Sequence, residues 1–102
     1  MRVFMSVQIP TSNGNDAIKN GAFPRLMGKF LETHKPEAAY FITANGERTA
    51  HLYLDMKDVS QMPLFAEPFF QELNAKVTWC PAMNADDVRK GLESLGTMVA
   101  AR

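Results

Sequence analysis

The fold is decided by residues 38–55, AAYFITANGERTAHLYLD. The two halves of this stretch are rich in β-branched and aromatic residues, and they flank the pair Asn45-Gly46. An Asn-Gly pair between two such runs predicts a two-residue β-hairpin turn, because both turn positions need a positive φ. A turn at this pair places Tyr40 opposite His51, whereas a three-residue loop would shift the pairing and exchange the two faces.

The same kinds of pattern continue on both sides of the hairpin. Alternation of side chains predicts strands, and apolar residues three and four positions apart predict helices. The predicted strands are 2–9, 38–44, 49–55 and 76–82, and the predicted helices lie around 18–31, 59–73 and 84–99. Residues 11–16 are expected to form a loop, and Pro24 indicates either a kinked first helix or a main helix that starts near Phe23.

The predicted element order is β-α-β-β-α-β-α, in a single domain that spans residues 1–102. Its first six elements form the ferredoxin-like arrangement of the α+β class, in which two helices cover one face of a four-stranded antiparallel sheet. The last element is an extra C-terminal helix. The helix-facing side is predicted to carry Val3, Met5, Val7, Phe41, Leu52, Leu54, Val77 and Trp79, and the other side Phe4, Ser6, Gln8, Tyr40, Ile42, His51, Tyr53, Thr78 and Cys80.

The second of these faces has an unusual composition for the surface of a sheet. It is too rich in apolar and aromatic side chains to be left exposed on a small monomer. It is also too polar to be an ordinary core. A homodimer that packs two sheets together around a partly filled cavity satisfies both facts, so we expect the chain to pair with a second copy of itself.

Composition and charge exclude several classes of protein. Eleven basic and eleven acidic side chains give a formal net charge of zero, whereas a nucleic-acid-binding chain normally has a basic surplus. No apolar run approaches the roughly 20 residues of a membrane span, and the N-terminal run is too short for a secretory signal. The single cysteine, Cys80, excludes an internal disulfide, and no residue spacing indicates a metal site. These features favour a soluble cytoplasmic protein that binds neither nucleic acid nor membrane.

Five short matches accompany the predicted element order: KPEAAYF at 35–41, GERT at 46–49, Asp55, AEPF at 66–69 and PAM at 81–83. With them, the chain is similar to a family of small bacterial proteins that points to no established chemistry. In element order nearly the whole chain resembles the dimeric α+β barrel superfamily. The resemblance implies two ferredoxin-like chains packed sheet to sheet, with a pocket between sheet and helices. Superfamily members include cofactor-free monooxygenases, haem-degrading enzymes, isomerising and decarboxylating enzymes and ligand-sensing domains, so the cofactor stays unknown.

Two residues are candidates for acid–base catalysis. His51 is predicted at mid-strand on the cavity face, where an imidazole suits proton transfer. The alternative is a structural histidine at a dimer interface. Glu67 precedes Pro68 within a predicted helix and would suit a base at the cavity mouth. Its alternatives are a solvated helix residue or a partner for a basic group such as Arg48.

Four further residues are predicted to bind a ligand. Ser6, Tyr40 and Tyr53 are expected on the same face as His51, and the guanidinium of Arg48 is suited to hold a carboxylate. Interface packing is the alternative for Tyr40, and a solvated edge charge is the alternative for Arg48. The sequence therefore predicts a homodimer that binds a small hydrophobic or aromatic metabolite beside the sheet. The alternative is a cofactor-free monooxygenase-, isomerase- or decarboxylase-like enzyme that uses His51.

Overall fold

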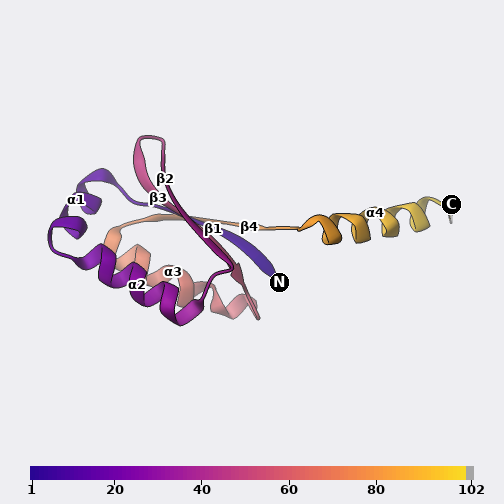
Figure 1. The fold of residues 1–102 in the computed structure, drawn as a ribbon, viewed down its shortest axis with the longest axis horizontal. Coiled ribbons are helices and arrows are strands. Elements are labelled where there is room, and N and C mark those ends of the chain that lie inside the picture. The colour runs from indigo at the N-terminus through magenta and orange to yellow at the C-terminus, as the bar shows by residue number, and fades with distance from the viewer. Residues whose placement is uncertain (101–102) are drawn as a thin grey trace.

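The computed structural model describes residues 1–100 and shows an α+β fold with a four-stranded antiparallel sheet (Figure 1). The strands are β1 (Arg2–Gln8), β2 (Ala38–Ala44), β3 (Glu47–Asp55) and β4 (Lys76–Pro81), in the order β2-β3-β1-β4 across the sheet. The helices are α1 (Thr11–Lys19), α2 (Ala22–His34), α3 (Met62–Leu73) and α4 (Ala85–Ala100), and a short 3-10 helix, η1 (Val59–Gln61), precedes α3. The four predicted strands are confirmed. No helix within the described residues has the length and apolar character needed to cross a membrane.

The hairpin between β2 and β3 has the predicted register. Tyr40 pairs with His51, and Ala44 pairs with Glu47 at the turn. The turn pair Asn45-Gly46 has φ values of 55° and 76°. Both values lie in the left-handed region, which Asn and Gly adopt at the lowest cost. Because the turn sets the register, it also decides which side chains of β3 face the helices.

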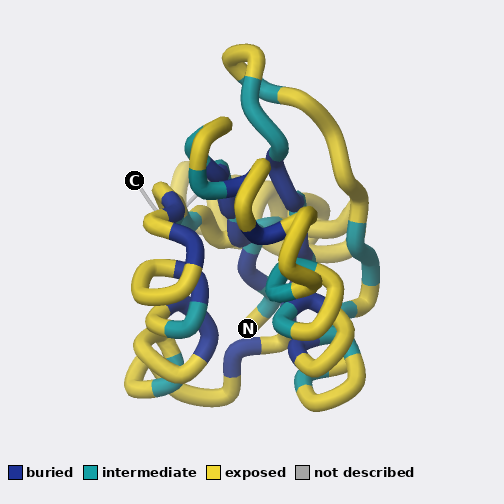
Figure 2. Tube along the Cα trace, turned by 90° about the vertical axis from the view of Figure 1, so that its left-hand side faces the viewer, coloured by how far each residue is buried: buried dark blue, intermediate teal, exposed yellow. Residues whose placement is uncertain are grey.

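Helices α1, α2 and α3 lie on one side of the sheet, and the hydrophobic core lies between them and the strands (Figures 1 and 2). Alternate residues of each strand point into this core. The core includes Val3, Met5, Val7, Leu52 and Leu54 from the sheet and Met27, Phe30, Phe65, Phe69 and Leu73 from the helices. Val77 and Trp79 pack against it while half-buried. Phe41 shares their side of the sheet but remains 53% exposed, because it lies on an edge strand.

The segment between β1 and β2 differs from the sequence prediction, which placed one helix there. The chain forms two helices, α1 and α2, separated at Gly21. The φ of Gly21 is 79°, which a helix interior does not allow. Pro24 therefore falls in the first turn of α2, where a missing N–H costs no intrahelical hydrogen bond. Of the two predicted alternatives, a main helix starting near Phe23 is the correct one.

Residues 11–16, predicted as a loop, belong to α1. Their local sequence is a poor helix former, because Asn, Ser and Gly favour turns over helix interiors. A side chain of β3 stabilises the start of this helix. The carboxylate of Glu47 accepts a hydrogen bond from the backbone N–H of Thr11 at 2.8 Å. This contact satisfies one of the free N–H groups at the start of α1. The pKa of Glu47 lies below its ordinary value because the carboxylate accepts hydrogen bonds, first from the Gln8 side chain, which has the larger effect, and then from the Thr11 backbone.

Helix α4 projects beyond the end of the sheet, which gives the molecule a longest dimension of 60 Å (Figure 1). Its start is well defined: Asn84 and Asp87 exchange backbone-to-side-chain hydrogen bonds of 3.0 and 2.8 Å. Asp87 also pairs with Arg2 of β1 at 3.1 Å. The predicted apolar side of this helix is exposed, with Leu92 at 62%. The extra C-terminal helix is thus present, but it does not contribute to the core.

Candidate functional site

The side of the sheet opposite α1, α2 and α3, here named the open face, carries four of the predicted site residues. His51 pairs with Ser6 of β1 on one side and with Tyr40 of β2 on the other. Tyr53 lies two positions further along β3 and therefore on the same face. Tyr40 is 63% exposed, and the other three are half-buried. The structure thus brings together residues from three neighbouring strands.

Phe4 lies among these residues and joins their rings. Its ring centroid is 4.8 Å from that of His51, with the two planes at 82°. The ring of Tyr53 lies 5.2 Å away on a tilted plane. Edge-to-face contacts of this kind orient an imidazole by ring packing. The sequence placed Phe4 on this face by its alternation with Ser6, but did not identify it as part of the site.

The open face has no cover within residues 1–100. Helices α1, α2 and α3 lie on the other side of the sheet, and α4 extends past its end (Figure 1). Large apolar or aromatic side chains therefore meet solvent, including Tyr40 at 63% and Ile42 at 43% exposure. Contiguous apolar surface on a small protein marks a site for a ligand or a partner.

Arg48 does not join this group. It pairs with Thr43, so by alternation it points to the side of the helices. Its Nη2 donates a hydrogen bond to Oδ1 of Asn15 in α1 at 3.1 Å. A β-carbon at Gly14 would lie only 2.7 Å from Nη1 of Arg48. Glycine at that position therefore leaves room for the guanidinium, and Arg48 fastens α1 to the hairpin.

Glu67 also lies away from the open face. It is an exposed residue of α3, in the helical layer. Its Oε1 accepts a hydrogen bond from Nε2 of Gln71 at 2.9 Å, one turn along the same helix. His51 and Glu67 are therefore on opposite sides of the sheet, and the two predicted catalytic residues do not share a site.

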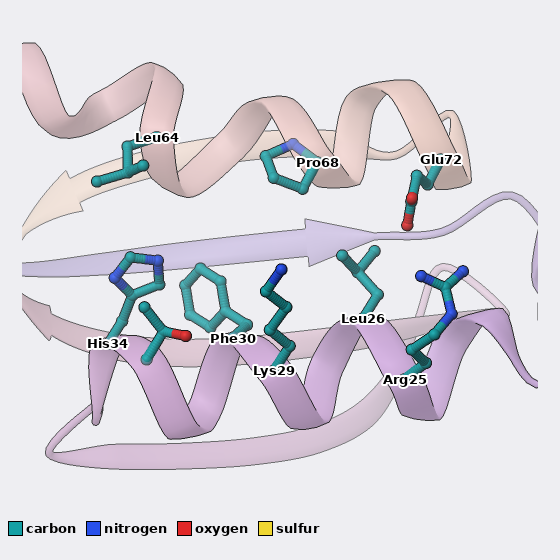
Figure 3. Close-up of a pocket in the computed structure, with 9 residues that line it drawn as sticks. Arg25, Leu26, Lys29, Phe30, His34, Leu64, Pro68 and Glu72 are labelled. Carbon is teal, nitrogen blue, oxygen red and sulfur yellow. The ribbon is translucent and has the colours of Figure 1, made fainter.

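Sequence reasoning missed an apolar groove between α2 and α3. The groove has a volume of about 440 Å³, and Arg25, Leu26, Lys29, Phe30, Thr33, His34, Leu64, Pro68 and Glu72 line it. Figure 3 shows Leu26 and Phe30 between the two helices, with Arg25 and Glu72 at one end and His34 at the other. The available signal was the i, i+4 spacing of Leu26 and Phe30 beside that of Arg25 and Lys29.

His34 behaves as part of the wall of this groove. Its ring lies 4.7 Å from the ring of Phe30 and 4.7 Å from that of Phe65. Burial against these neighbours lowers the pKa of His34 from its ordinary value, because a charged imidazole is poorly solvated there. The neutral ring therefore packs as a third aromatic group.

A metal centre does not emerge from the part of the chain that the structure describes. Among residues 1–100, no three His, Cys, Asp or Glu side chains are grouped so as to hold a metal ion. The four predicted site residues on the open face, together with Phe4, supply one imidazole, three hydroxyl groups and three further aromatic rings. These groups are suited to contact an organic ligand through ring packing and a few hydrogen bonds.

Comparisons with protein-family models, with curated proteins and with solved structures find no match to this chain. The structure itself establishes an α+β fold with a four-stranded antiparallel sheet. The resemblance to the dimeric α+β barrel superfamily therefore stays a prediction, and no residue role is transferred from a relative.

Proposed function

We propose that the protein is a ferredoxin-like homodimer of the dimeric α+β barrel type that binds a small hydrophobic or aromatic metabolite at the open face. The strand order supports the ferredoxin-like part of this proposal. Strands β1 and β3 are central, β2 and β4 are at the edges, and helices follow β1 and β3 along the chain. In this interpretation α1 and α2 together take the place of the first crossover helix.

The observation that carries the proposal is the composition and exposure of the open face. Small-molecule sites are mostly apolar, with a few polar groups that fix the orientation of the ligand. The rings of Phe4, His51 and Tyr53 supply the first property, and the hydroxyls of Ser6 and Tyr40 contribute to the second. Two such faces held further apart than the ~10 Å of directly packed sheets would enclose a flat organic molecule between aromatic walls.

Catalysis by His51 is the alternative that one observation favours. In the register of the sheet, the imidazole has hydroxyl-bearing neighbours on both sides, Ser6 and Tyr40. Such neighbours would suit proton transfer in a cofactor-free oxygenation, isomerisation or decarboxylation. Glu67 cannot assist, because it belongs to the other layer. Binding is better supported, since it requires only the face itself.

Native mass spectrometry of the freshly purified chain tests the assembly. It reports the number of subunits and the mass of any small molecule that copurifies. We expect a dimer that carries the additional mass of an organic ligand. A chain that stays monomeric at tens of micromolar would contradict the proposed homodimer.

Binding of 2-naphthol, a neutral aromatic probe, tests the position of the site. Calorimetry should show an affinity that falls at least fivefold in Tyr53→Ala and in His51→Ala. The matched control is Leu64→Ala, which alters the groove between α2 and α3 at a residue that is 57% exposed. If Leu64→Ala alone weakens binding, the open face is not the ligand site. Once a substrate is found, unchanged turnover in His51→Ala would exclude the catalytic alternative.

A further inference from the structure

Two apolar surfaces of the chain are left without cover among the described residues, and the first is on α4. A stripe of four residues recurs at spacings of four, three and four, which places them on one side of the helix. These residues, here named the α4 stripe, are Val88, Leu92, Leu95 and Val99, and they are between 41% and 62% exposed. Ser94 and Lys90 lie on the other side. Isolated helices of this length are marginal in water, so the α4 stripe indicates a packing partner.

The second surface is strand β2. Its residues Tyr40, Phe41 and Ile42 are consecutive and are 63%, 53% and 43% exposed, so both faces of the strand are uncovered. β2 lies at an edge of the sheet, and residues 38–44 include neither charge nor proline. Natural edge strands are protected by charge, proline, a bulge or a covering element. β2 therefore calls for a covering element.

A recess beside β2 offers a place for the side chains of such an element. Its volume is about 360 Å³, and Ile9, Phe23, Phe41, Ile42, Thr43, Arg48, Thr49 and Ala50 line it. Five of these eight side chains are apolar. Side chains of the size of Leu92 and Leu95 would find an apolar environment there.

The two surfaces match in length but do not meet within one chain (Figure 1). The 16 residues of α4 span about 24 Å, and the seven residues of β2 span about 23 Å. However, α4 starts next to β4, at the opposite edge of the sheet, where Asp87 is held by Arg2 at 3.1 Å. The edges are three strand spacings of about 4.8 Å apart. A second copy of the chain has one α4 stripe and one exposed β2, so each surface of the first copy finds its counterpart on the second.

We propose that α4 of each protomer docks along β2 of a second copy, with the α4 stripe against Phe41 and Ile42 and in the recess beside them. The exchange is reciprocal, so a two-fold dimer covers both stripes and both edge strands. This inference rests on the self-association of the chain proposed above, but not on the open-face contact, and it names the element that joins the copies. It also places α4 of one copy beside the open face of the other.

The test uses three variants of the full chain and sedimentation velocity. The stripe variant combines Leu92→Lys and Leu95→Lys, the edge variant is Phe41→Lys, and the control is Ser94→Lys. Circular dichroism confirms that each variant is folded. The wild type and the control should be dimers, and the stripe and edge variants should each raise the dissociation constant of the dimer at least tenfold.

Mixing the stripe variant with the edge variant gives the decisive result. The intact α4 stripe of the edge variant then meets the intact β2 of the stripe variant, so mixed dimers should form more tightly than dimers of either variant alone. A mixture that dissociates as readily as its components overturns the proposal. If the dimer instead formed through two α4 stripes, or through two β2 strands, each mixed dimer would still contain one altered surface at the contact. Mixing the two variants would then not restore a tight dimer.

A fourth variant, Thr78→Lys, separates this proposal from the open-face dimer. Thr78 is an exposed residue of β4, far from β2. If Thr78→Lys weakens the dimer while the stripe and edge variants do not, the open-face dimer stands and the docking of α4 is wrong. The reverse pattern supports the docking of α4 and contradicts the open-face contact. A monomeric wild-type chain overturns both.

Discussion

The two faces of this sheet share the same strands but differ in composition and in cover. On β3, Leu52 is fully buried at 0% exposure, while its neighbours His51 and Tyr53 are only half-buried. One face is apolar and closed by three helices. The other mixes rings, hydroxyls and an imidazole, and nothing among residues 1–100 closes it. The covered face accounts for the folding of the chain, so the composition of the open face calls for a ligand or a partner.

The strongest test of this contrast compares adjacent residues of β3. Leu52→Ala should lower the free energy of unfolding by about 2–5 kcal/mol, because it leaves a cavity in the packed core. His51→Ala should cost less than about 1 kcal/mol, the usual range for positions outside a core. Urea denaturation of the two variants measures both values. A cost at His51 that equals the cost at Leu52 would mean that the open face is packed like a core.

The turn of the hairpin decides which residues belong to which face, and a pair of glycine substitutions tests it. Gly46→Ala should destabilise the chain by about 1–2 kcal/mol, because alanine is strained at the φ of 76°. The control is Gly28→Ala in α2, where nothing lies within 4 Å of the added methyl group. That change should stabilise the chain by roughly 0.5–1 kcal/mol. Thermal unfolding distinguishes the destabilisation expected at Gly46 from the stabilisation expected at Gly28. If Gly46→Ala left the stability unchanged, the turn would not be what sets the register of the hairpin.

The division of the sheet into two faces could be predicted from the sequence because its signals are local. Alternation in β1 and β3 and the pair Asn45-Gly46 give the faces and the register without knowledge of the rest. Helix α1 could not be predicted in this way. Its first free N–H group is satisfied by Glu47, which lies 36 positions away from Thr11.

The candidate site, too, could be predicted only where local signals define the position of a side chain. Ser6, Tyr40, His51 and Tyr53 come together because strand parity places them on one face and the order β2-β3-β1 makes their strands neighbours. The parity of Arg48 also follows from the register, and it points to the helices, but the sequence interpretation placed Arg48 among the ligand-binding residues, with an exposed charge at the strand edge as the alternative. The position of Glu67 depends on how α3 is rotated over the sheet, which its neighbours in sequence do not define. The exposure of the α4 stripe depends on the direction in which the chain leaves β4.

The smallest expected effect is a pH dependence that belongs to the helical layer. Burial lowers the pKa of His34 below its ordinary value of 6.5, so the folded chain binds a proton less readily there than the unfolded chain does. The contribution of His34 to the free energy of unfolding is therefore complete above pH 6.5, where the imidazole is neutral in both states. It is lost as the pH falls through the lower pKa of the folded state. The chain should therefore unfold at a slightly lower urea concentration at pH 5.5 than at pH 7.5.

A pair of histidine variants assigns this loss to one side of the sheet. His34→Phe keeps a ring beside Phe30 and Phe65 and should remove the difference between the two pH values. His51→Phe, on the open face, should retain it. The carboxylates of Asp55 and Asp87, whose pKa values are lowered by hydrogen bonds with Lys57 and the Asn84 backbone respectively, stay ionised at pH 5.5 and do not contribute. If His34→Phe retained the difference, the loss of stability at the lower pH would arise outside the helical layer around Phe30 and Phe65.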